Sequence, residues 1–366
     1  MKKIMLVFGT RPEAIKMCPL VLELQTKKEL QTLVCVTGQH REMLDSVLRI
    51  FKVEPDYDLA VMKPGQTLFD ITCSVVMGMR AILEKAAPDL VLVHGDTTTA
   101  FASALACYYE KIPVGHVEAG LRTGNLYAPY PEEFNRRAVA VLARYHFAPT
   151  SGAAENLLRE GIEKAQIYVT GNTAIDALKV TVNGSFSHPV LERLAGRRML
   201  LMTAHRRENL GEPLHRIFSA VRTLCDRHPE IVLVYPVHPN PAVQTAAHKA
   251  FDGCPNAVLT EPLDAVAFHN FMSRAYLVLT DSGGAQEEAP AFGVPVLVLR
   301  DTTERPEGIA AGTARLVGTD PSLILEVCET LLSDSNEYEK MAHAVSPYGD
   351  GHAAQRIADI LVRSMT

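Results

Sequence analysis

Two apolar runs, each ending in an acid among small polar residues, constrain the fold of this chain most. Residues 90–93 lead into His94-Gly95-Asp96, and residues 113–117 lead into Glu118. Such runs are typical of parallel strands covered on both faces, and residues 100–109 between them have the length and alanine content of a crossover helix. Both acids then follow carboxyl ends of neighbouring strands, where open α/β sheets bind ligands. Glu132, near the start of the next helical pattern, is expected to reach the same crevice.

A plainer interpretation of these acids is structural. Asp96 could only cap the following helix, and Glu118 could only pair with Arg122. Two acids in matched positions after neighbouring strands favour the shared crevice.

The alternation of strands and helices continues along the whole chain and predicts an α/β fold with two Rossmann-like, doubly wound domains facing a cleft. We expect an N-terminal domain over residues 1–175 that carries the catalytic acids. We expect a C-terminal, ligand-binding domain over 176–350, and a helix within 351–366 that packs back on the first domain. The predicted strands are residues 4–8, 33–36, 90–93, 114–117, 146–148 and 167–169, then 199–202, 231–235, 257–259, 276–279, 296–299 and 315–317.

Composition limits the partners of the protein. The 366 residues are 47% apolar and carry a formal charge of −6, so no general attraction to nucleic acid or to an anionic membrane is expected. The seven cysteines have no CxxC spacing, which favours reduced thiols in a cytoplasmic protein over a disulfide framework or a metal site. We find no signal peptide and no apolar run long enough to span a membrane, and therefore expect a soluble protein.

Candidate phosphate-binding loops occur in both halves. In the first half, Gly9 leads into a helical pattern with Arg11 and Lys16, a chemistry suited to an anion at a helix N-terminus, although the GxGxxG fingerprint of dinucleotide sites is absent. The alternative for Lys16 is a solvated helix face. In the second half, Ser282-Gly283-Gly284 precedes an acid that could bind a ribose. The alternative there is a glycine turn capped by Ser282.

Two further polar stretches follow strands of the second half. The first is His205-Arg206-Arg207, for which the alternatives are a capping or packing histidine and a solvated arginine pair. The second, residues 300–307, places further arginines at the same edge. Four polar loops at one edge favour a binding function.

These segments together resemble the non-hydrolysing bacterial UDP-N-acetylglucosamine 2-epimerases over nearly the whole chain. The resemblance is carried by residues 8–16 (FGTRPEAIK), 93–99 (VHGDTTT), 116–122 (HVEAGLR), 205–208 (HRRE), 281–288 (DSGGAQEE) and 300–307 (RDTTERPE). It implies a glycosyltransferase-B-like fold, UDP-sugar in the cleft with UDP bound by the C-terminal domain (176–350), a homodimer, and no cofactor and no metal. It also implies reversible conversion of UDP-N-acetylglucosamine to UDP-N-acetylmannosamine for bacterial surface polysaccharide synthesis.

The resemblance also implies roles for individual residues. The catalytic positions are Asp96, Glu118, Glu132 and His205. The UDP-binding positions are Arg11, Lys16, Phe268, Ser282, Gly283, Gly284, Glu288 and Arg305. Some relatives bind a second UDP-N-acetylglucosamine as an allosteric activator, at positions matching Gln39, His40, Gln66, Glu132, Arg206 and His238. One regulated relative has an arginine where this chain has Gly65.

The chemistry of such a reaction favours elimination. The hydrogen at C2 of the sugar has no adjacent carbonyl to acidify it, and loss of UDP from C1 with removal of the C2 proton gives a glycal. Re-addition of UDP with protonation from the opposite face inverts C2. Carboxylates on both faces and donors on the diphosphate are then required. The alternatives are a nucleotide-sugar glycosyltransferase of the same fold and a catalytically silent UDP-sugar sensor.

Overall fold

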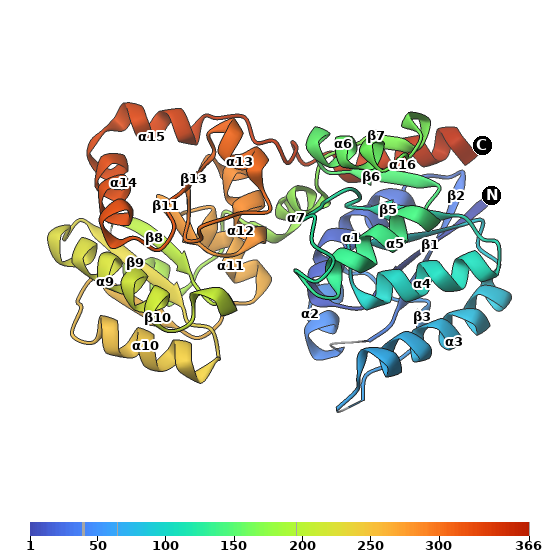
Figure 1. The fold of residues 1–366 in the computed structure, drawn as a ribbon, viewed down its shortest axis with the longest axis horizontal. Coiled ribbons are helices and arrows are strands. Elements are labelled where there is room, and N and C mark those ends of the chain that lie inside the picture. Colours follow the sequence, from blue (N-terminus) through green and yellow to red (C-terminus); the bar gives the residue numbers. More distant parts are fainter. Residues whose placement is uncertain (39–40, 64, 195, 366) are drawn as a thin grey trace. The chain divides into compact units, whose positions relative to one another are not determined.

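The computed structural model describes residues 1–38, 41–63, 65–194 and 196–365, apart from the side chains of residues 41, 42 and 207. It divides into two compact units. Unit 1 comprises Met1–Val180 and Tyr348–Thr366, and unit 2 comprises Thr181–Pro347. Each unit is built around one parallel β-sheet (Figure 1).

Unit 1 contains a seven-stranded sheet in the order β3-β2-β1-β4-β5-β6-β7. Its strands are β1 (Lys2–Phe8), β2 (Leu30–Val36), β3 (Tyr57–Asp58), β4 (Leu90–His94), β5 (Val114–Val117), β6 (Tyr145–Ala148) and β7 (Ile167–Val169). Its helices are α1 (Arg11–Gln25), α2 (Arg41–Phe51), α3 (Leu68–Ala86), α4 (Thr98–Tyr109), α5 (Glu132–Leu142), α6 (Ser151–Arg159), α7 (Thr173–Thr181) and α16 (Ala353–Met365). The strand order reverses between β1 and β4, so the crevice favoured for ligands lies at their carboxyl ends.

Both faces of the unit 1 sheet are covered. One core joins β1 and β2 to α1, α2 and α16, with Ile357 and Leu361 of α16 fully buried. The other joins the opposite face to α3 and α4. The C-terminal helix therefore completes the first unit, where it packs against α1.

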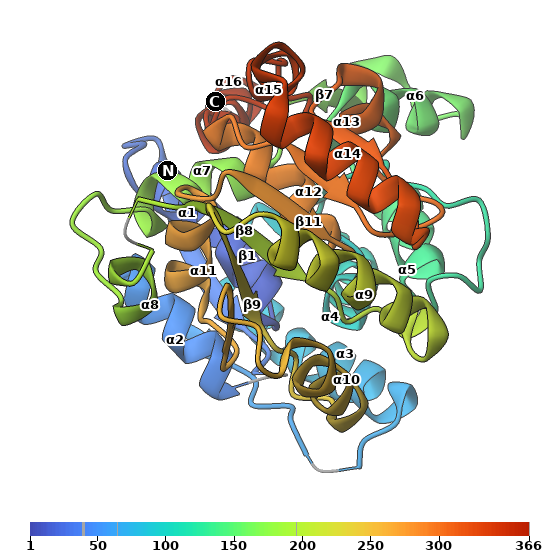
Figure 2. The same ribbon diagram turned by 90° about the vertical axis from the view of Figure 1, so that its left-hand side faces the viewer.

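Unit 2 contains a six-stranded sheet in the order β10-β9-β8-β11-β12-β13, which reverses between β8 and β11. Its strands are β8 (Arg198–Thr203), β9 (Ile231–Pro236), β10 (Ala257–Thr260), β11 (Leu277–Thr280), β12 (Val296–Val298) and β13 (Ala314–Leu316). Its helices are α8 (Pro189–Glu192), α9 (Glu212–Arg227), α10 (Pro241–Phe251), α11 (Ala265–Met272), α12 (Gly283–Glu288), α13 (Pro306–Ala311), α14 (Pro321–Ser333) and α15 (Ser335–Ala342). Helix α14 packs beside α9 (Figure 2).

The predicted fold class, α/β with two doubly wound, Rossmann-like sheets, is confirmed. Every predicted strand is present, with ends displaced by up to three residues. Strand β3 was not predicted because its two residues, Tyr57 and Asp58, form no apolar run.

Among the described residues, no helix is both long and apolar enough to cross a membrane. In the same residues, no group of three or more His, Cys, Asp or Glu side chains is placed to hold a metal ion.

Candidate functional site

The turns that follow β1 and β4 are tied together by one buried acid, Glu13. Its carboxylate accepts hydrogen bonds from the amides of Gly9 (3.0 Å) and Thr10 (2.8 Å) and from the hydroxyl of Thr97 (2.7 Å). Burial raises the pKa of Glu13, and these hydrogen bonds oppose the rise. A Cβ at Gly9 would lie 2.0 Å from Oγ1 of Thr37, so only glycine fits this turn.

The predicted cations of the first loop lie in different surroundings. The side chain of Arg11, the first residue of α1, is exposed. The side chain of Lys16 is only 14% exposed and its ammonium forms an ion pair with Glu118. The alternative of a solvated helix face is therefore wrong for Lys16.

Glu118 stands directly after β5 in a backbone conformation that non-glycine residues rarely adopt, with φ of 63°. Its Oε2 accepts from the Lys16 ammonium and from Nδ2 of Asn172 at 3.1 Å, and Nε2 of His94 lies 3.8 Å away. A left-handed non-glycine residue costs of order 1–3 kcal/mol and occurs most often at functional sites. Glu118 adopts this conformation at the carboxyl end of β5, which is the edge of the sheet where ligands are expected.

Asp96 lies after β4 and is held by helix α5. Its carboxylate pairs with Arg136, and its backbone carbonyl accepts from Nδ2 of Asn135 at 2.9 Å. Arg136 also contacts Glu133, which is fully buried. Glu132, half-buried, is the first residue of the same helix.

Asp96 and Glu118 share one neighbour, the buried ring of His94. Burial lowers the pKa of His94 to about 4, the negative charges of Glu118 and Asp96 oppose that change, and Lys16 adds to it. The ring is therefore neutral at physiological pH and stands among both candidate acids and a cation.

The structure excludes the plainer interpretation of these acids. The N-cap of α4 is Thr97, whose side chain accepts from the amide of Ala100, so Asp96 does not cap this helix. Arg122 forms its ion pair with Glu160 and not with Glu118.

In unit 2, His205 and Arg206 follow β8 and are positioned by the buried carboxylate of Asp281, which directly follows the neighbouring strand β11. Oδ2 of Asp281 accepts both backbone amides at 2.8 Å. The His205 ring stacks on His238, with centroids 5.2 Å apart. Burial lowers the pKa of His205, Asp281 opposes that change, and His238 and Arg206 reinforce it. His205 is thus held in place with a ring that favours the neutral form.

Helix α12 begins within the glycine loop of unit 2, and the side chain of Arg305 lies against this loop. Ser282 is the N-cap residue, but its side chain makes no capping hydrogen bond, so a capping role does not account for it. A Cβ at Gly283 would lie 2.8 Å from Cζ of Arg305, whose Nε donates to Glu287 at 2.8 Å. A side chain at position 283 would displace the Arg305 guanidinium from the loop.

The other predicted UDP-binding residues of unit 2 lie near this loop and on α11. Gly284 is close to Glu288, the last residue of α12, since a Cβ at Gly284 would lie 3.7 Å from its Oε1. Oε2 of Glu288 lies 3.5 Å from Nε2 of His269. Phe268, on α11, is partly buried against the unit 2 core.

Comparisons with known proteins identify the family. The family model described as UDP-N-acetylglucosamine 2-epimerase matches residues 22–362. The chain is 54% identical to the UDP-N-acetylglucosamine 2-epimerase of Bacillus subtilis, over 98% of this chain and 95% of the relative. It is 50% identical to that of Escherichia coli K12, over 98% of each. The chain belongs to the UDP-N-acetylglucosamine 2-epimerase family.

A solved structure agrees with this assignment. The UDP-GlcNAc 2-epimerase of Neisseria meningitidis, solved with UDP-GlcNAc bound, matches with a TM-score of 0.90 and 47% identity, covering 99% of this chain and 100% of that one. The prediction of a UDP-N-acetylglucosamine 2-epimerase with a glycosyltransferase-B-like fold is therefore confirmed.

The residues predicted for a second sugar nucleotide are only partly described in this epimerase. Gln39 and His40 lie outside the described residues. The side chain of Gln66 forms hydrogen bonds within its own loop. Its Nε2 donates to the carbonyl of Val61 at 2.8 Å, and its Oε1 accepts from the amide of Lys63 at 2.7 Å. Arg206 donates from Nε to the carbonyl of Asp281 at 3.3 Å, and His238 is exposed.

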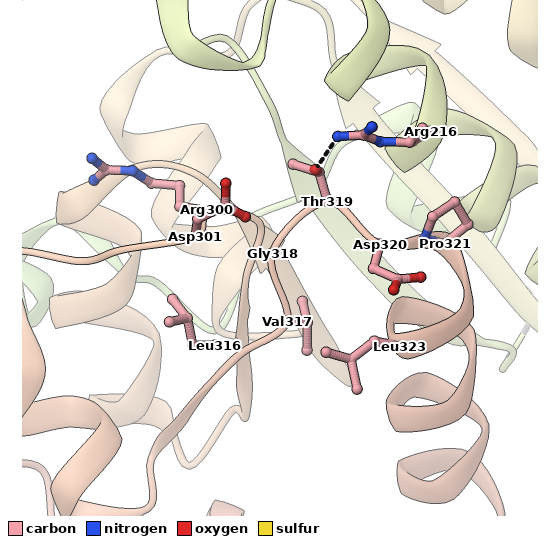
Figure 3. A pocket seen from close by; sticks show the side chains of 10 residues that line it. All are labelled: Arg216, Arg300, Asp301, Leu316, Val317, Gly318, Thr319, Asp320, Pro321 and Leu323. Atoms are coloured by element: carbon pink, nitrogen blue, oxygen red, sulfur yellow. Dashed lines mark hydrogen bonds between the residues drawn. The ribbon is translucent and has the colours of Figure 1, made fainter.

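A cavity of about 630 Å³ opens in unit 2 of the epimerase, where β12 and β13 end (Figure 3). Its lining includes residues 316–321, together with Arg216, Arg300 and Asp301. Arg216 points across it and donates to Oγ1 of Thr319 at 2.8 Å. None of the predicted site residues lines this cavity, although Arg300 belongs to the predicted basic stretch 300–307.

Sequence reasoning assigned no role to several residues that position the acids and the loop. Asn172 lies in the turn after β7, so the rule that polar groups after strands bind ligands could have found it. Arg136 and Glu287 lie inside helices, and only the folded structure pairs them with Asp96 and Arg305.

Proposed function

We propose that the protein interconverts UDP-N-acetylglucosamine and UDP-N-acetylmannosamine by elimination of UDP and its re-addition. The observation that carries this mechanism is the placing of Asp96 and Glu118 around one neutral histidine, each with its own cation, Arg136 and Lys16. Carboxylates so placed can remove and return a proton, and nearby cations can stabilise a departing diphosphate.

The steps balance without a redox partner. One carboxylate takes the proton from C2, the C1–O bond breaks with its electron pair leaving on UDP, and the C1–C2 double bond of 2-acetamidoglucal forms. In the return step UDP adds to C1 while a carboxylic acid protonates C2 from the opposite face. Asp96, Glu118 and Glu132 are the proposed proton-transfer groups.

Each unit carries residues proposed to contact the diphosphate or the nucleoside. Arg11 and Lys16 of unit 1 are the cations at the start of α1. His205, Arg305 and the amides of Ser282-Gly283-Gly284 supply the donors of unit 2. Glu288 suits the ribose hydroxyls, and Phe268 suits the flat nucleobase.

Turnover in heavy water tests the elimination mechanism. Solvent deuterium should appear at C2 of the product, because a carboxylic acid exchanges its proton between the half-reactions.

Substitution of the three acids by their amides is a second test. Asp96→Asn, Glu118→Gln and Glu132→Gln should each lower kcat by about 10²- to 10⁴-fold, the usual contribution of general acid–base catalysis. UDP binding by calorimetry should survive in all three. Product without deuterium at C2, or three amide variants near wild-type rates, would refute the mechanism.

We also propose that UDP-N-acetylglucosamine activates the enzyme at a second site formed by Gln39, His40, Gln66, Glu132, Arg206 and His238. Glu132 belongs to both proposed sets, so occupancy of one site would position the other. Gly65, exposed with φ of 73°, stands where a regulated relative has arginine. The rate should be sigmoidal in UDP-N-acetylglucosamine, and hyperbolic kinetics in both directions would remove this proposal.

A homodimer is proposed through the outer face of α3, α4 and α5, the dimer face. These helices pack side by side in unit 1 (Figure 1). Their exposed large apolar side chains are Leu68, Phe69, Met77, Tyr108, Tyr109, Phe134 and Val141. Large exposed apolar patches mark interaction sites in soluble proteins.

We also propose that the enzyme acts in the cytoplasm, in the synthesis of surface polysaccharide. The cysteines are free thiols, which is typical of cytoplasmic proteins.

A further inference from the structure

One carboxylate oxygen of Glu118 lies close to three groups of different chemistry among the residues that the structure describes. Lys16 is a cation, Asn172 is a neutral amide donor, and His94 presents Nε2 at 3.8 Å. A cation stabilises the carboxylate and weakens it as a base, whereas a neutral donor orients it with a smaller effect on its basicity. A carboxylate that must accept a proton from carbon is therefore better served by neutral donors during the reaction.

His94 is such a neutral donor held close to the acid but not yet bonded to it. It is the last residue of β4, next to β5, and only 4% exposed. Its Nε2 is buried and has no hydrogen-bond partner among the residues that the structure describes. A buried polar atom without a partner is destabilising, so an apolar side chain would suit this position better if packing were its only task.

Nε2 of His94 lies only slightly too far from Oε2 of Glu118 for a hydrogen bond. A separation of 3.8 Å is too long for a hydrogen bond, and a shift of about 1 Å would close it to normal length. The charged and titratable groups facing His94 are Glu118 after β5, His116 within β5, Lys16 of α1 and Asp96 of its own loop.

We propose that His94 is a positioning residue for Glu118, and that its Nε2–H bonds the carboxylate when Lys16 turns to the diphosphate of the substrate. This inference rests on the proposed function, in which Glu118 transfers the C2 proton and Lys16 binds the diphosphate. Lys16 then holds Glu118 in the free enzyme, and His94 and Asn172 hold it during turnover. The base is freed of its cation only when the nucleotide is present.

Two neutral amide substitutions test the role of the Nε2 atom. In His94→Gln the amide reaches the position of Nε2, whereas in His94→Asn it reaches only that of Nδ1. We expect H94Q to keep kcat within about threefold of wild type and H94N to lose about 10- to 100-fold, the range expected for misplacing a catalytic group by about 1 Å. KM should change little, because the lost contact acts on the chemical step.

The pH profile separates positioning from packing. Loss of the donor should raise the pKa of Glu118 in the complex, so the acid limb of the kcat profile of H94N should move to higher pH. In the Glu118→Gln background, H94N should cost less than about twofold further, since residues that act through one another are not additive. A matched control is His146→Asn, an equally buried histidine on β6, which should lower thermal stability without moving the pH profile.

The outcomes are distinguishable. Equal kcat values for H94Q and H94N, or full additivity with E118Q, would overturn the role of His94. If wild-type product carries no deuterium at C2, the proposed mechanism fails first. Deuterium at C2 together with equal H94Q and H94N rates leaves the mechanism standing and removes only this inference. Both substitutions are polar and no larger than histidine, and melting curves show whether each variant folds.

Discussion

At the scale of single residues, unit 1 buries three histidines on adjacent strands. His94 ends β4, His116 lies in β5 and His146 lies in β6, paired with His116 across the sheet. Nε2 of His116 bonds the carbonyl of Gly95 at 2.7 Å, so the ring supports the turn that carries Asp96. Burial lowers the pKa of these rings to about 4, 3 and 4 respectively, which keeps all three neutral near pH 7.

These histidines predict a loss of stability in mild acid. The folded pKa values lie below 6.5, so below about pH 6.5 the unfolded chain binds protons that the folded chain does not, and the free energy of unfolding falls until about pH 4. Each histidine contributes a slope of about 1.4 kcal/mol per pH unit. Urea unfolding measured from pH 7.5 to 4.5 checks this slope.

Two variants, one at a buried histidine and one at an exposed histidine, test whether burial causes this pH dependence of the free energy of unfolding. His146→Gln should flatten the pH dependence by about one histidine's share, about 1.4 kcal/mol per pH unit, whatever it does to stability at pH 7.5. His343→Gln, at an exposed position of unit 2, should leave the slope unchanged. Equal slopes for H146Q and wild type would contradict the assignment.

At the scale of elements, apolar runs and helix lengths predicted nearly all the strands, and polar residues after those strands predicted most of the candidate site. The structure places Asp96 and Glu118 at one edge of the sheet, as the rule predicts, because the parallel strands β4 and β5 are neighbours with their carboxyl ends together. It did not predict that Lys16 pairs with Glu118 across 102 positions of sequence. Such pairs depend on the packing of α1 against the sheet, which no local pattern encodes.

The turn from β1 into α1 makes an element-scale prediction. A Cβ at Gly9 would lie 2.0 Å from Oγ1 of Thr37 and 2.7 Å from Oγ1 of Thr99, so Gly9→Ala must move β2, α4 or α1. Overpacking of this kind costs about 1–3 kcal/mol. We expect G9A to lower Tm and also kcat, because the Glu13 network that ties α1 to α4 includes the Gly9 amide. Gly184→Ala, with open space around its Cβ, is the control that should change neither.

At the scale of the whole molecule, the chain uses one architecture twice. Each unit has a parallel sheet whose order reverses at a central strand pair, β1 and β4 in unit 1 and β8 and β11 in unit 2. In both, buried acids position the loops at that reversal, Glu13 in unit 1 and Asp281 in unit 2. In the proposed function the two edges have different roles: unit 1 carries the acids proposed for proton transfer, and unit 2 carries the glycine loop with His205 and Arg305, which are proposed to bind UDP.

The dimer face gives the last prediction. A stable interface buries about 800 Å² on each partner, and charged residues are depleted from its centre. Phe69 on α3 is 83% exposed and Val141 on α5 is 81% exposed. Placing carboxylates there, as in the double variant Phe69→Asp/Val141→Asp, should cause like-charge repulsion across a two-fold axis and convert the dimer to monomer in sedimentation velocity at micromolar concentration. Val345→Asp in unit 2, at a position 84% exposed, should leave the sedimentation coefficient unchanged. If F69D/V141D sediments as wild type does, the assembly uses another face; a monomeric wild type would exclude the homodimer itself.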